Sequence, residues 1–110
     1  MVRLSPSGHD PAPIFAALGD STRLALVGRL SEGQPRSITV LSADTHLTRQ
    51  AITKHLHVLE EVGLVHSVRS GRESQFAFQP ARIADVTAYL QDVSAQWDSA
   101  LARLRALVEK

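Results

Sequence analysis

Apolar residues recur at helical spacing between residues 48 and 62, and this is the clearest hydrophobic pattern in the chain. The apolar positions lie three or four residues apart and share one face of a helix. They are Ile52, Leu56, Leu59 and Val62. Thr48 is suited to cap the first turn, because its hydroxyl can accept a hydrogen bond from a backbone N–H that lacks a helical partner. Gly63 is suited to end the helix. The pattern predicts one amphipathic helix over residues 48–62.

The first half of this helix carries polar side chains of the kinds that contact DNA bases and phosphates. They are Thr48, Arg49, Gln50, Thr53, Lys54, His55 and His57. Residues 46–59 contain no carboxylate, although the helix dipole favours acids and disfavours bases in the first turn. A major groove admits one α-helix, and Arg, Gln and Lys can address base edges there. The segment therefore favours a DNA-reading helix over an ordinary solvated helix face.

Two short helices are predicted before this one, near the N-terminus. The first starts around Pro13, which fits a first helical turn, and ends at Gly19. Its apolar residues are Ile14, Phe15 and Leu18. The second is capped by Asp20 or Ser21 and ends by Gly33. Its expected inner face consists of Leu24, Val27 and Leu30.

A third short helix is predicted over residues 38–44, with the sequence ITVLSAD. Ser37 is its expected cap, and Val40 and Leu41 are expected to face inward. The turn that leads into the 48–62 helix is expected at Asp44, Thr45 and His46. A short helix, a brief turn and a longer second helix are the pattern of a helix-turn-helix.

After the 48–62 helix the spacing changes from helical to alternating. The runs LVHSVRS and ESQFAFQ flank Gly71 and Arg72 and predict a two-stranded hairpin over residues 64–79. Two aromatic side chains share one face of the second strand, Phe76 and Phe78. Arg69 and Arg72 lie at the tip. They are either solvated turn charges or, directly after a reading helix, the arginines of a wing that contacts phosphate or a neighbouring minor groove.

A long helix is predicted over residues 81–108, about 42 Å at 1.5 Å per residue. Its apolar positions keep alternating spacings of three and four, which makes an unbroken heptad seam. The seam consists of Ile83, Val86, Leu90, Val93, Trp97, Ala100, Leu104 and Leu107. The other helices are too short to cover it, so we expect part of it to form a two-fold interface with a second copy rather than to pack within one chain.

Composition adds little to this picture. The net charge is +1, so only the local charge distribution favours nucleic acid. The absence of cysteine excludes disulfides and thiolate metal ligands. No apolar run approaches the roughly 20 residues of a membrane span, and the N-terminus lacks a signal peptide core. We therefore expect a cytoplasmic protein without a membrane partner. Residues 1–11 are expected to form a flexible tail and residues 12–110 one domain.

The segments IFAALGDSTRLALVGRL, LTRQAITKHLHVLEEVGLV and RSGRESQFAF together resemble the ArsR/SmtB family of winged helix-turn-helix repressors. The resemblance covers roughly residues 13–108. It implies a mainly α fold of about five helices with a small β-hairpin, and a dimer that binds double-stranded DNA and represses a nearby operon. It also implies DNA contacts by Thr48, Arg49, Gln50, Thr53, Lys54, His55, Arg69 and Arg72; to these we add His57.

The same resemblance implies a dimer interface built from the first and last helices. The residues expected there are Ile14, Phe15, Leu18, Ile83, Val86, Leu90, Val93, Trp97, Leu101, Leu104 and Leu107. Asp20 and Arg23, in the GDSTR segment that matches a family signature, are expected to act structurally, as a cap and an ion-pairing residue.

The chain departs from this family in its metal ligands. Many members use a cysteine pair before the recognition helix, but this segment reads ITVLSAD. Others use Asp and His on the last helix, but residues 81–110 contain no histidine. The carboxylates Asp85, Asp92 and Asp98 lack the nitrogen or sulfur partners that zinc or nickel prefers. We therefore expect no metal and no cofactor. A small-molecule inducer stays open, and Trp97 either lines a pocket for it or anchors the dimer.

The combined prediction is a homodimeric, sequence-specific repressor with helix 48–62 in the major groove and hairpin 64–79 as the wing. An enzyme is not expected, because the chain has no glycine-rich phosphate loop and no recognisable nucleophile triad. The remaining alternative is a winged helix that binds proteins and has no operator. The clustered Arg49, Gln50, Thr53 and Lys54 argue against that alternative, since a protein-binding module does not need them.

Overall fold

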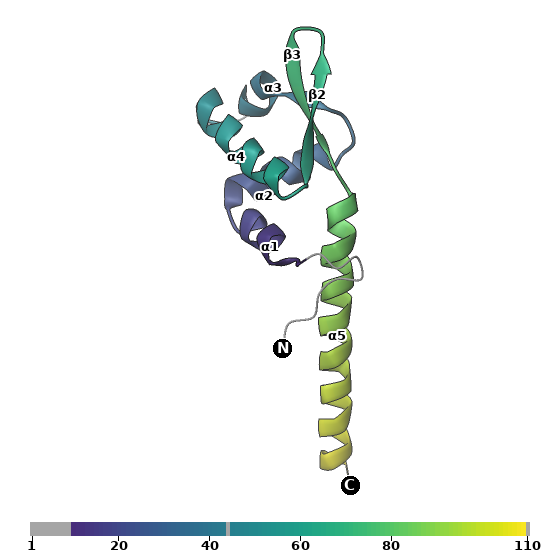
Figure 1. The fold of residues 1–110 in the computed structure, drawn as a ribbon. Coiled ribbons are helices and arrows are strands. Elements are labelled where there is room, and N and C mark those ends of the chain that lie inside the picture. Colours follow the sequence, from purple (N-terminus) through teal and green to yellow (C-terminus); the bar gives the residue numbers. More distant parts are fainter. Residues whose placement is uncertain (1–9, 44, 110) are drawn as a thin grey trace.

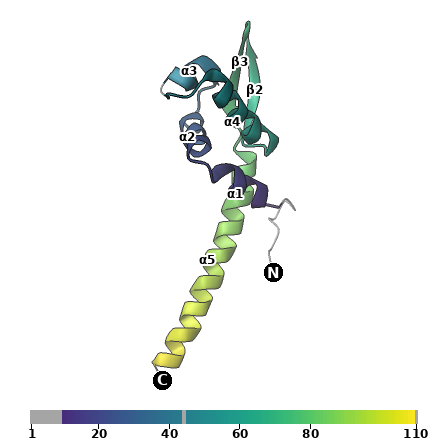
Figure 2. The same cartoon turned by 90° about the vertical axis from the view of Figure 1, so that its left-hand side faces the viewer.

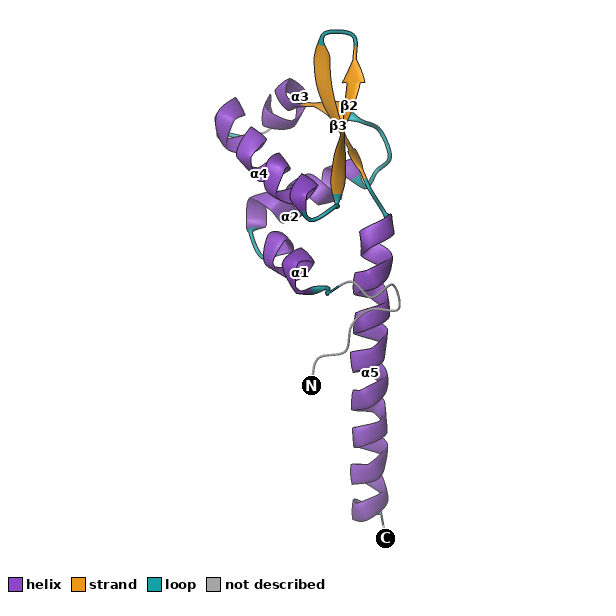
Figure 3. Ribbon diagram, viewed as in Figure 1, coloured by secondary structure: helices purple, strands orange, loops and turns teal. Residues whose placement is uncertain are grey.

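The computed structural model describes residues 10–43 and 45–109. Within these residues, five helices and three short strands follow one another (Figures 1 and 3). In order they are α1 (Ala12–Leu18), α2 (Ser21–Leu30), β1 (Arg36–Ser37), α3 (Ile38–Ala43), α4 (Arg49–Glu61), β2 (Val65–Ser70), β3 (Glu73–Phe78) and α5 (Ala81–Val108). The predicted fold class, a mainly helical winged helix-turn-helix, is confirmed.

Two parts of the molecule differ sharply in shape. Helices α1 to α4 and the sheet form one packed body, whereas α5 leaves that body and continues alone, as the two perpendicular views show (Figures 1 and 2). The molecule consequently measures 68 × 29 × 23 Å. The wing lies at one end, and the C-terminal end of α5 lies at the other (Figure 1).

One apolar core holds the body together, and the inner face of α4 lies at its centre. Ile52, Leu56 and Leu59 are fully buried, as the helical spacing predicts. Val62 is only half-buried, at the edge of the core. The core residues contributed by the other elements are Ile14, Ala17, Leu26, Val27, Leu30, Leu41, Leu64, Val65, Phe76 and Val86.

Two predicted core positions are wrong. Leu24 on α2 and Val40 on α3 are 55% and 43% exposed. On α2 the buried side is formed by Leu26, Val27 and Leu30 instead. Both helices are short, so more than one set of apolar positions fits the helical spacing. Which set is buried depends on tertiary packing, which the spacing does not show.

Both ends of α4 are fixed by local hydrogen bonds. At the start, the Ala51 N–H donates to the Thr48 hydroxyl at 3.1 Å, which confirms the predicted cap. At the end, Gly63 has a φ of 81°, a conformation that glycine adopts without strain. Its N–H donates to the Glu60 carbonyl, and the Leu64 N–H donates to the Leu59 carbonyl, both at 3.0 Å. This pair of bonds is a Schellman motif, and it turns the chain sharply into β2.

The wing is part of a three-stranded antiparallel sheet in the order β1-β3-β2, rather than the two-stranded hairpin that we predicted. Strand β1 has only two residues, Arg36 and Ser37, and it pairs with Phe76 and Gln75 of β3. A strand of two residues leaves no alternating pattern in the sequence. The β2–β3 hairpin itself agrees with prediction. Ser70 pairs with Glu73 around a two-residue turn, in which Gly71 has a φ of 61°.

Some predictions concern residues outside the described part of the chain. They are most of the N-terminal tail, 1–9, and the turn residue Asp44. Pro11, which we assigned to the tail, is buried and precedes the first turn of α1. None of the helices in residues 10–43 and 45–109 combines the length and the apolar character that a membrane-spanning segment needs.

Replacing Thr48 with alanine is expected to destabilise the fold, because it removes the hydroxyl that accepts the Ala51 N–H. The expected loss is about 1 kcal/mol of unfolding free energy, the usual value for such caps, measured by urea denaturation. Thr87→Ala on the exposed side of α5 is the matched control and should not destabilise, since alanine favours helix. Equal effects of the two substitutions would contradict the capping role.

Candidate nucleic-acid interface

The start of α4 presents a cluster of exposed polar side chains. Thr48, Arg49, Gln50, Lys54 and His57 are all exposed, which agrees with the predicted outer face of this helix. Gln50, Lys54 and His57 lie opposite Ile52, Leu56 and Leu59, so burial of the inner face directs them outward, whereas Thr48 and Arg49 are exposed because they lie at the start of the helix. These five residues form the polar face of α4.

Thr53 differs from its neighbours, because its hydroxyl is already used. It donates a 2.7 Å hydrogen bond to the Arg49 carbonyl, one helical turn earlier, and the residue is half-buried. Such bonds are common for threonine inside helices. Its methyl group is the part that remains for an outside contact.

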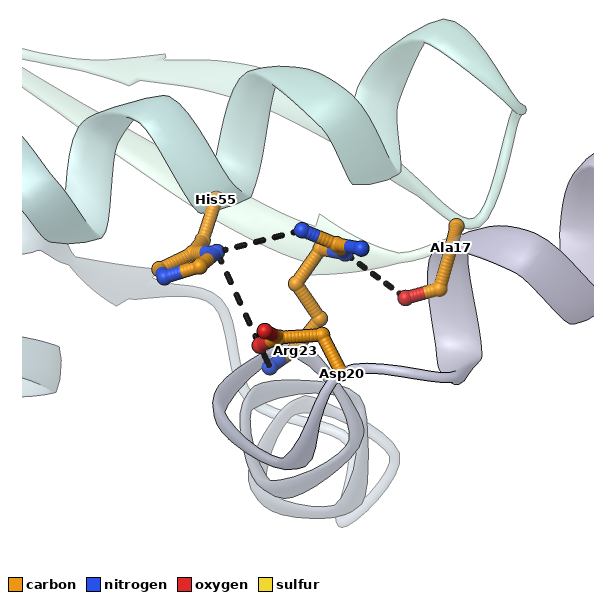
Figure 4. A network of polar contacts seen from close by, with 4 residues as sticks. All are labelled: Ala17, Asp20, Arg23 and His55. Carbon is orange, nitrogen blue, oxygen red and sulfur yellow. Dashed lines mark hydrogen bonds and ion pairs between the residues drawn. The ribbon is translucent and has the colours of Figure 1, made fainter.

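His55, which we predicted among the DNA contacts, is directed toward α2 (Figure 4). Its Nδ1 atom lies 3.4 Å from Nη1 of Arg23 and 3.8 Å from a carboxylate oxygen of Asp20. The side chain is 24% exposed. The assignment of His55 to the DNA surface is therefore corrected. Two residues along a helix correspond to about 200° of rotation, so His57 is exposed while His55 is directed to the body.

Arg23 connects three helices at this point (Figure 4). Its Nε donates a 2.7 Å hydrogen bond to the Ala17 carbonyl in α1, and its Nη1 lies beside His55 of α4. The predicted structural roles are partly confirmed. Asp20 caps α2 by accepting the Arg23 N–H at 3.0 Å. The Arg23 side chain, however, hydrogen-bonds to a carbonyl rather than to the Asp20 carboxylate. A sequence pattern cannot reveal this link, because residues 23 and 55 lie far apart in the chain.

The pKa of the Asp20 carboxyl is lowered from its usual 3.8, mainly because the carboxylate accepts the backbone N–H of Arg23. The positive charge of Arg23 and the backbone N–H of Thr22 lower it further. These contacts stabilise the charged form of the carboxyl.

The wing is tied to the end of α4 by a carboxylate. A single Glu60 oxygen accepts hydrogen bonds from the Ser67 backbone N–H at 3.2 Å and the Ser67 hydroxyl at 2.7 Å. At the tip, Nε of Arg69 donates to the Gly71 carbonyl at 3.2 Å, so this guanidinium is held along the turn. Arg72 is exposed at the tip itself. The Glu60–Ser67 contact fixes the hairpin relative to α4.

A polar hollow of about 260 Å³ lies between the wing tip and the start of α4. Arg49 contributes from α4 and Arg72 from the wing, so the two guanidinium groups line the same space. Its other lining residues are Ser37, Ile38, Thr39, Glu73 and Ser74. Two arginines from separate elements around one hollow suit a phosphate group. The negative charge of Glu73 restricts the part of the hollow that an anion can occupy.

The opposite end of the molecule carries an apolar surface. From Leu90 onward the apolar side of α5 is increasingly uncovered, with Trp97 65% and Leu107 70% exposed. This surface, the α5 apolar face, consists of the exposed Leu90, Trp97, Leu101, Leu104 and Leu107 and the half-buried Val93. Phe15 of α1, 36% exposed, borders it through an edge-to-face contact with Tyr89 at a ring distance of 5.8 Å.

Two residues expected in the dimer interface are unavailable for it. Ile14 and Val86 are 0% and 7% exposed, because both pack into the core of their own chain. Leu18 and Ile83 are partly buried against the same core. The heptad seam therefore has two parts: its first turns bind the body, and its remainder is exposed. The heptad spacing itself continues unchanged through both parts and does not mark the division.

No group of three or more His, Asp or Glu side chains is placed to hold a metal ion in residues 10–43 and 45–109.

Residues 18–68 match a family of helix-turn-helix domains. The chain is 31% identical over 101 residues to the HTH-type transcriptional regulator Rv2034 of Mycobacterium tuberculosis, covering 92% of this chain and 91% of that protein. It is 48% identical over 65 residues to the HTH-type transcriptional regulator YuzN of Bacillus subtilis. That match covers 54% of this chain and 71% of YuzN. The structure of an ArsR-like transcriptional regulator from Rhodococcus superposes on this chain with a TM-score of 0.75 at 35% sequence identity. The superposition covers 87% of this chain and 90% of the Rhodococcus chain.

The chain belongs to the ArsR-like family of helix-turn-helix transcriptional regulators. This ArsR-like protein is accordingly a DNA-binding transcriptional regulator. The resemblance seen in its sequence segments is confirmed.

His55→Ala is expected to lower the stability of this ArsR-like protein, because it removes the contacts with Arg23 and Asp20. The expected loss is ~1 kcal/mol, comparable to one internal hydrogen bond. His57→Ala is the matched control and should change the unfolding free energy by less than ~0.5 kcal/mol, because the side chain is exposed. Denaturant titration of both variants measures this, and a larger loss in His57→Ala would contradict the assignment of His55.

The lowered pKa of Asp20 predicts a pH-dependent part of the stability. A carboxyl with a lowered folded-state pKa contributes stability above its unfolded value of 3.8, and the contribution is lost as pH falls through the folded value. Asp20→Asn keeps a capping oxygen but cannot titrate. The advantage of the wild type over Asp20→Asn should therefore shrink between about pH 5 and about pH 2, as measured by chemical unfolding. A pH-independent difference would contradict the prediction.

Proposed function

We propose that this regulator acts as a homodimeric repressor that binds a palindromic operator. The polar face of α4 enters the major groove, and the wing contacts the adjacent backbone. The observation that carries the proposal is the arrangement of Arg49 and Arg72 around one hollow, beside the exposed Gln50, Lys54 and His57. Residues for base contact and for phosphate contact thus lie next to each other.

The electrostatics of α4 support an anionic partner at its first turns. Arg49 and Lys54 lie in the half of the helix where its dipole favours negative charge. The acids Glu60 and Glu61 lie in the other half, and Glu60 is used to bind Ser67 of β2. The negative charge of a phosphate backbone at the N-terminal half offsets the unfavourable interaction of Arg49 and Lys54 with the helix dipole.

The apolar face of α5 supports a second copy. Five large apolar side chains on one helix side are exposed, with the half-buried Val93 among them, and exposed apolar surface of this kind marks an interface. A two-fold dimer covers the same face on both copies and carries two α4 helices. Two such helices can enter successive major grooves on one side of a duplex. Repression then follows from occupancy, because the bound dimer blocks access to the operator.

The apolar hollow beside Trp97 is better explained by dimer packing than by an inducer. It measures about 210 Å³ and is lined by Val93, Gln96, Trp97 and Ala100. Pockets for organic ligands usually hold roughly 300–1,000 Å³. We therefore assign Trp97 to contact with the second copy.

Gln50→Ala and Arg72→Ala are expected to impair DNA binding in different ways. Gln50 is assigned to base edges, so its loss should cost ~1–3 kcal/mol per half-site and relax the base preference. Arg72 is assigned to phosphate, so its loss should weaken binding to all sequences and reduce the salt dependence. Titrations of selected and scrambled duplexes at several salt concentrations measure both effects.

Gln91→Ala on the exposed side of α5 serves as the control for these titrations, since it lies far from α4 along the chain and should bind as the wild type does. If the Gln50 variant kept its base preference and the Arg72 variant kept its salt slope, the contact assignment would be refuted.

Leu104→Asp is expected to disrupt the dimer, because it places an unpaired carboxylate within an apolar interface. Gln91→Asp introduces the same charge on an exposed polar position of α5 and should leave the dimer intact. Sedimentation equilibrium distinguishes the two, with Leu104→Asp expected as a monomer. An intact Leu104→Asp dimer would show that the interface lies elsewhere.

A further inference from the structure

One methyl group lies among the polar side chains at the start of α4, and it belongs to Thr53. The Thr53 hydroxyl donates its hydrogen to the Arg49 carbonyl at 2.7 Å. This bond selects one rotamer, because threonine is branched at Cβ and its χ1 angle has few allowed values in a helix. The methyl group is therefore held in one direction as well, on a residue that is only half-buried.

The side chains around this methyl group are polar and exposed. Arg49 and His57 lie four residues before and after Thr53, and Gln50 lies three residues before it. Side chains at these spacings are neighbours on a helix surface, roughly 5–6 Å apart at Cβ. When these neighbours contact a duplex, they exclude water from the methyl group between them. An apolar contact at this position then gains the free energy of removing both of its partners from water.

The major groove offers one apolar group of the matching kind. Thymine presents its C5-methyl group there, and a threonine methyl group is one of the protein groups that contact it. We propose that the Thr53 methyl group contacts a thymine methyl group in each operator half-site. This inference rests on the proposed function, in which α4 enters the major groove, and it adds the identity of one base that α4 selects.

Gln50 indicates where this thymine lies in the half-site. A glutamine side chain can form two hydrogen bonds with N6 and N7 of an adenine. Gln50 and Thr53 are separated by about 4.5 Å along the helix axis, which is comparable with the roughly 3.4 Å step between base pairs. The two side chains therefore reach the same base pair or adjacent ones. The selected thymine lies within one step of an A·T pair that Gln50 contacts.

The Thr53 oxygen offers a rival contact, which the hydrogen bond to Arg49 restricts. The hydroxyl hydrogen is already used, so the group cannot donate to a base oxygen without losing the 2.7 Å bond. The oxygen can still accept a hydrogen bond from the amino group of adenine or cytosine. A methyl contact and an oxygen contact predict opposite results for serine and valine at position 53.

Replacing thymine with deoxyuridine tests the methyl contact, because the two bases differ only in the C5-methyl group. Each thymine of the best palindromic site is replaced in turn, in both half-sites together. At one position the deoxyuridine duplex should bind the wild type about 3- to 10-fold more weakly per half-site, the value for roughly one methyl–methyl contact. At that position, 5-methylcytosine should bind more tightly than cytosine, because it restores a methyl group at C5.

Two variants separate the methyl group from the oxygen. Thr53→Ser keeps the hydroxyl and removes the methyl group, so it should bind thymine and deoxyuridine duplexes equally. Thr53→Val keeps a methyl group and removes the oxygen, so it should retain the preference for thymine. Thr87→Ser on the exposed side of α5 makes the same change far from α4 along the chain and should behave as the wild type. Urea denaturation checks that all three variants are folded.

The salt dependence distinguishes this contact from the phosphate contact assigned to Arg72. Neither methyl group is charged, so the ratio of the thymine and deoxyuridine affinities should stay constant between about 50 and 200 mM salt. The affinity for each duplex should fall over the same range, because the phosphate contacts weaken. A ratio that changes with salt would attribute the preference to a charged group instead and would contradict the proposal.

The outcomes separate this inference from the operator binding on which it rests. A wild type that binds its site selectively but tolerates deoxyuridine at every thymine would overturn the inference alone. A preference for thymine that persists in Thr53→Ser would overturn it too, and its loss only in Thr53→Val would assign the contact to the oxygen. A wild type without any sequence preference would remove both the operator binding and this inference.

Discussion

Burial of the inner face of α4 is the constraint on which the rest of the structure depends. Ile52, Leu56 and Leu59 are fully buried in a core to which α1, α2, α3, β2, β3 and α5 also contribute. Each contributes roughly 1.5–3 kcal/mol when buried, so rotation of the helix about its axis would be costly. That fixed rotation exposes Gln50, Lys54 and His57. The Thr48 cap and the Schellman turn at Gly63 then fix where the helix starts and where the wing begins.

The two proposed interaction surfaces lie at opposite ends of the molecule. The polar face of α4 and the wing tip lie at one end, and the uncovered part of α5 extends from the other (Figure 1). Arg23 lies between them, contacting the last turn of α1 and His55 of α4. Since α1 also meets α5 through Phe15 and Tyr89, α4 is held by elements that border the proposed dimer interface.

The sequence was sufficient to predict the features that depend on neighbours along the chain. The inner face of α4, the Thr48 cap, the hairpin turn at Gly71 and the bounds of α5 all follow from local spacing and are confirmed. The features that depend on distant residues could not be predicted. Strand β1 is too short for a pattern, His55 is directed to α2 by Arg23, and Ile14 and Val86 are buried by packing.

The most direct test of the account is the number of chains on a selected duplex and its dependence on half-site spacing. Sedimentation velocity of the protein with its best palindromic site should give two chains per duplex. Inserting about 5 bp at the centre of the site rotates one half-site by half a turn and should abolish the two-chain complex. Inserting about 10 bp, a full turn, restores the orientation of the half-sites and should disturb binding less. One chain per duplex, or equal binding to all three spacings, would contradict the account.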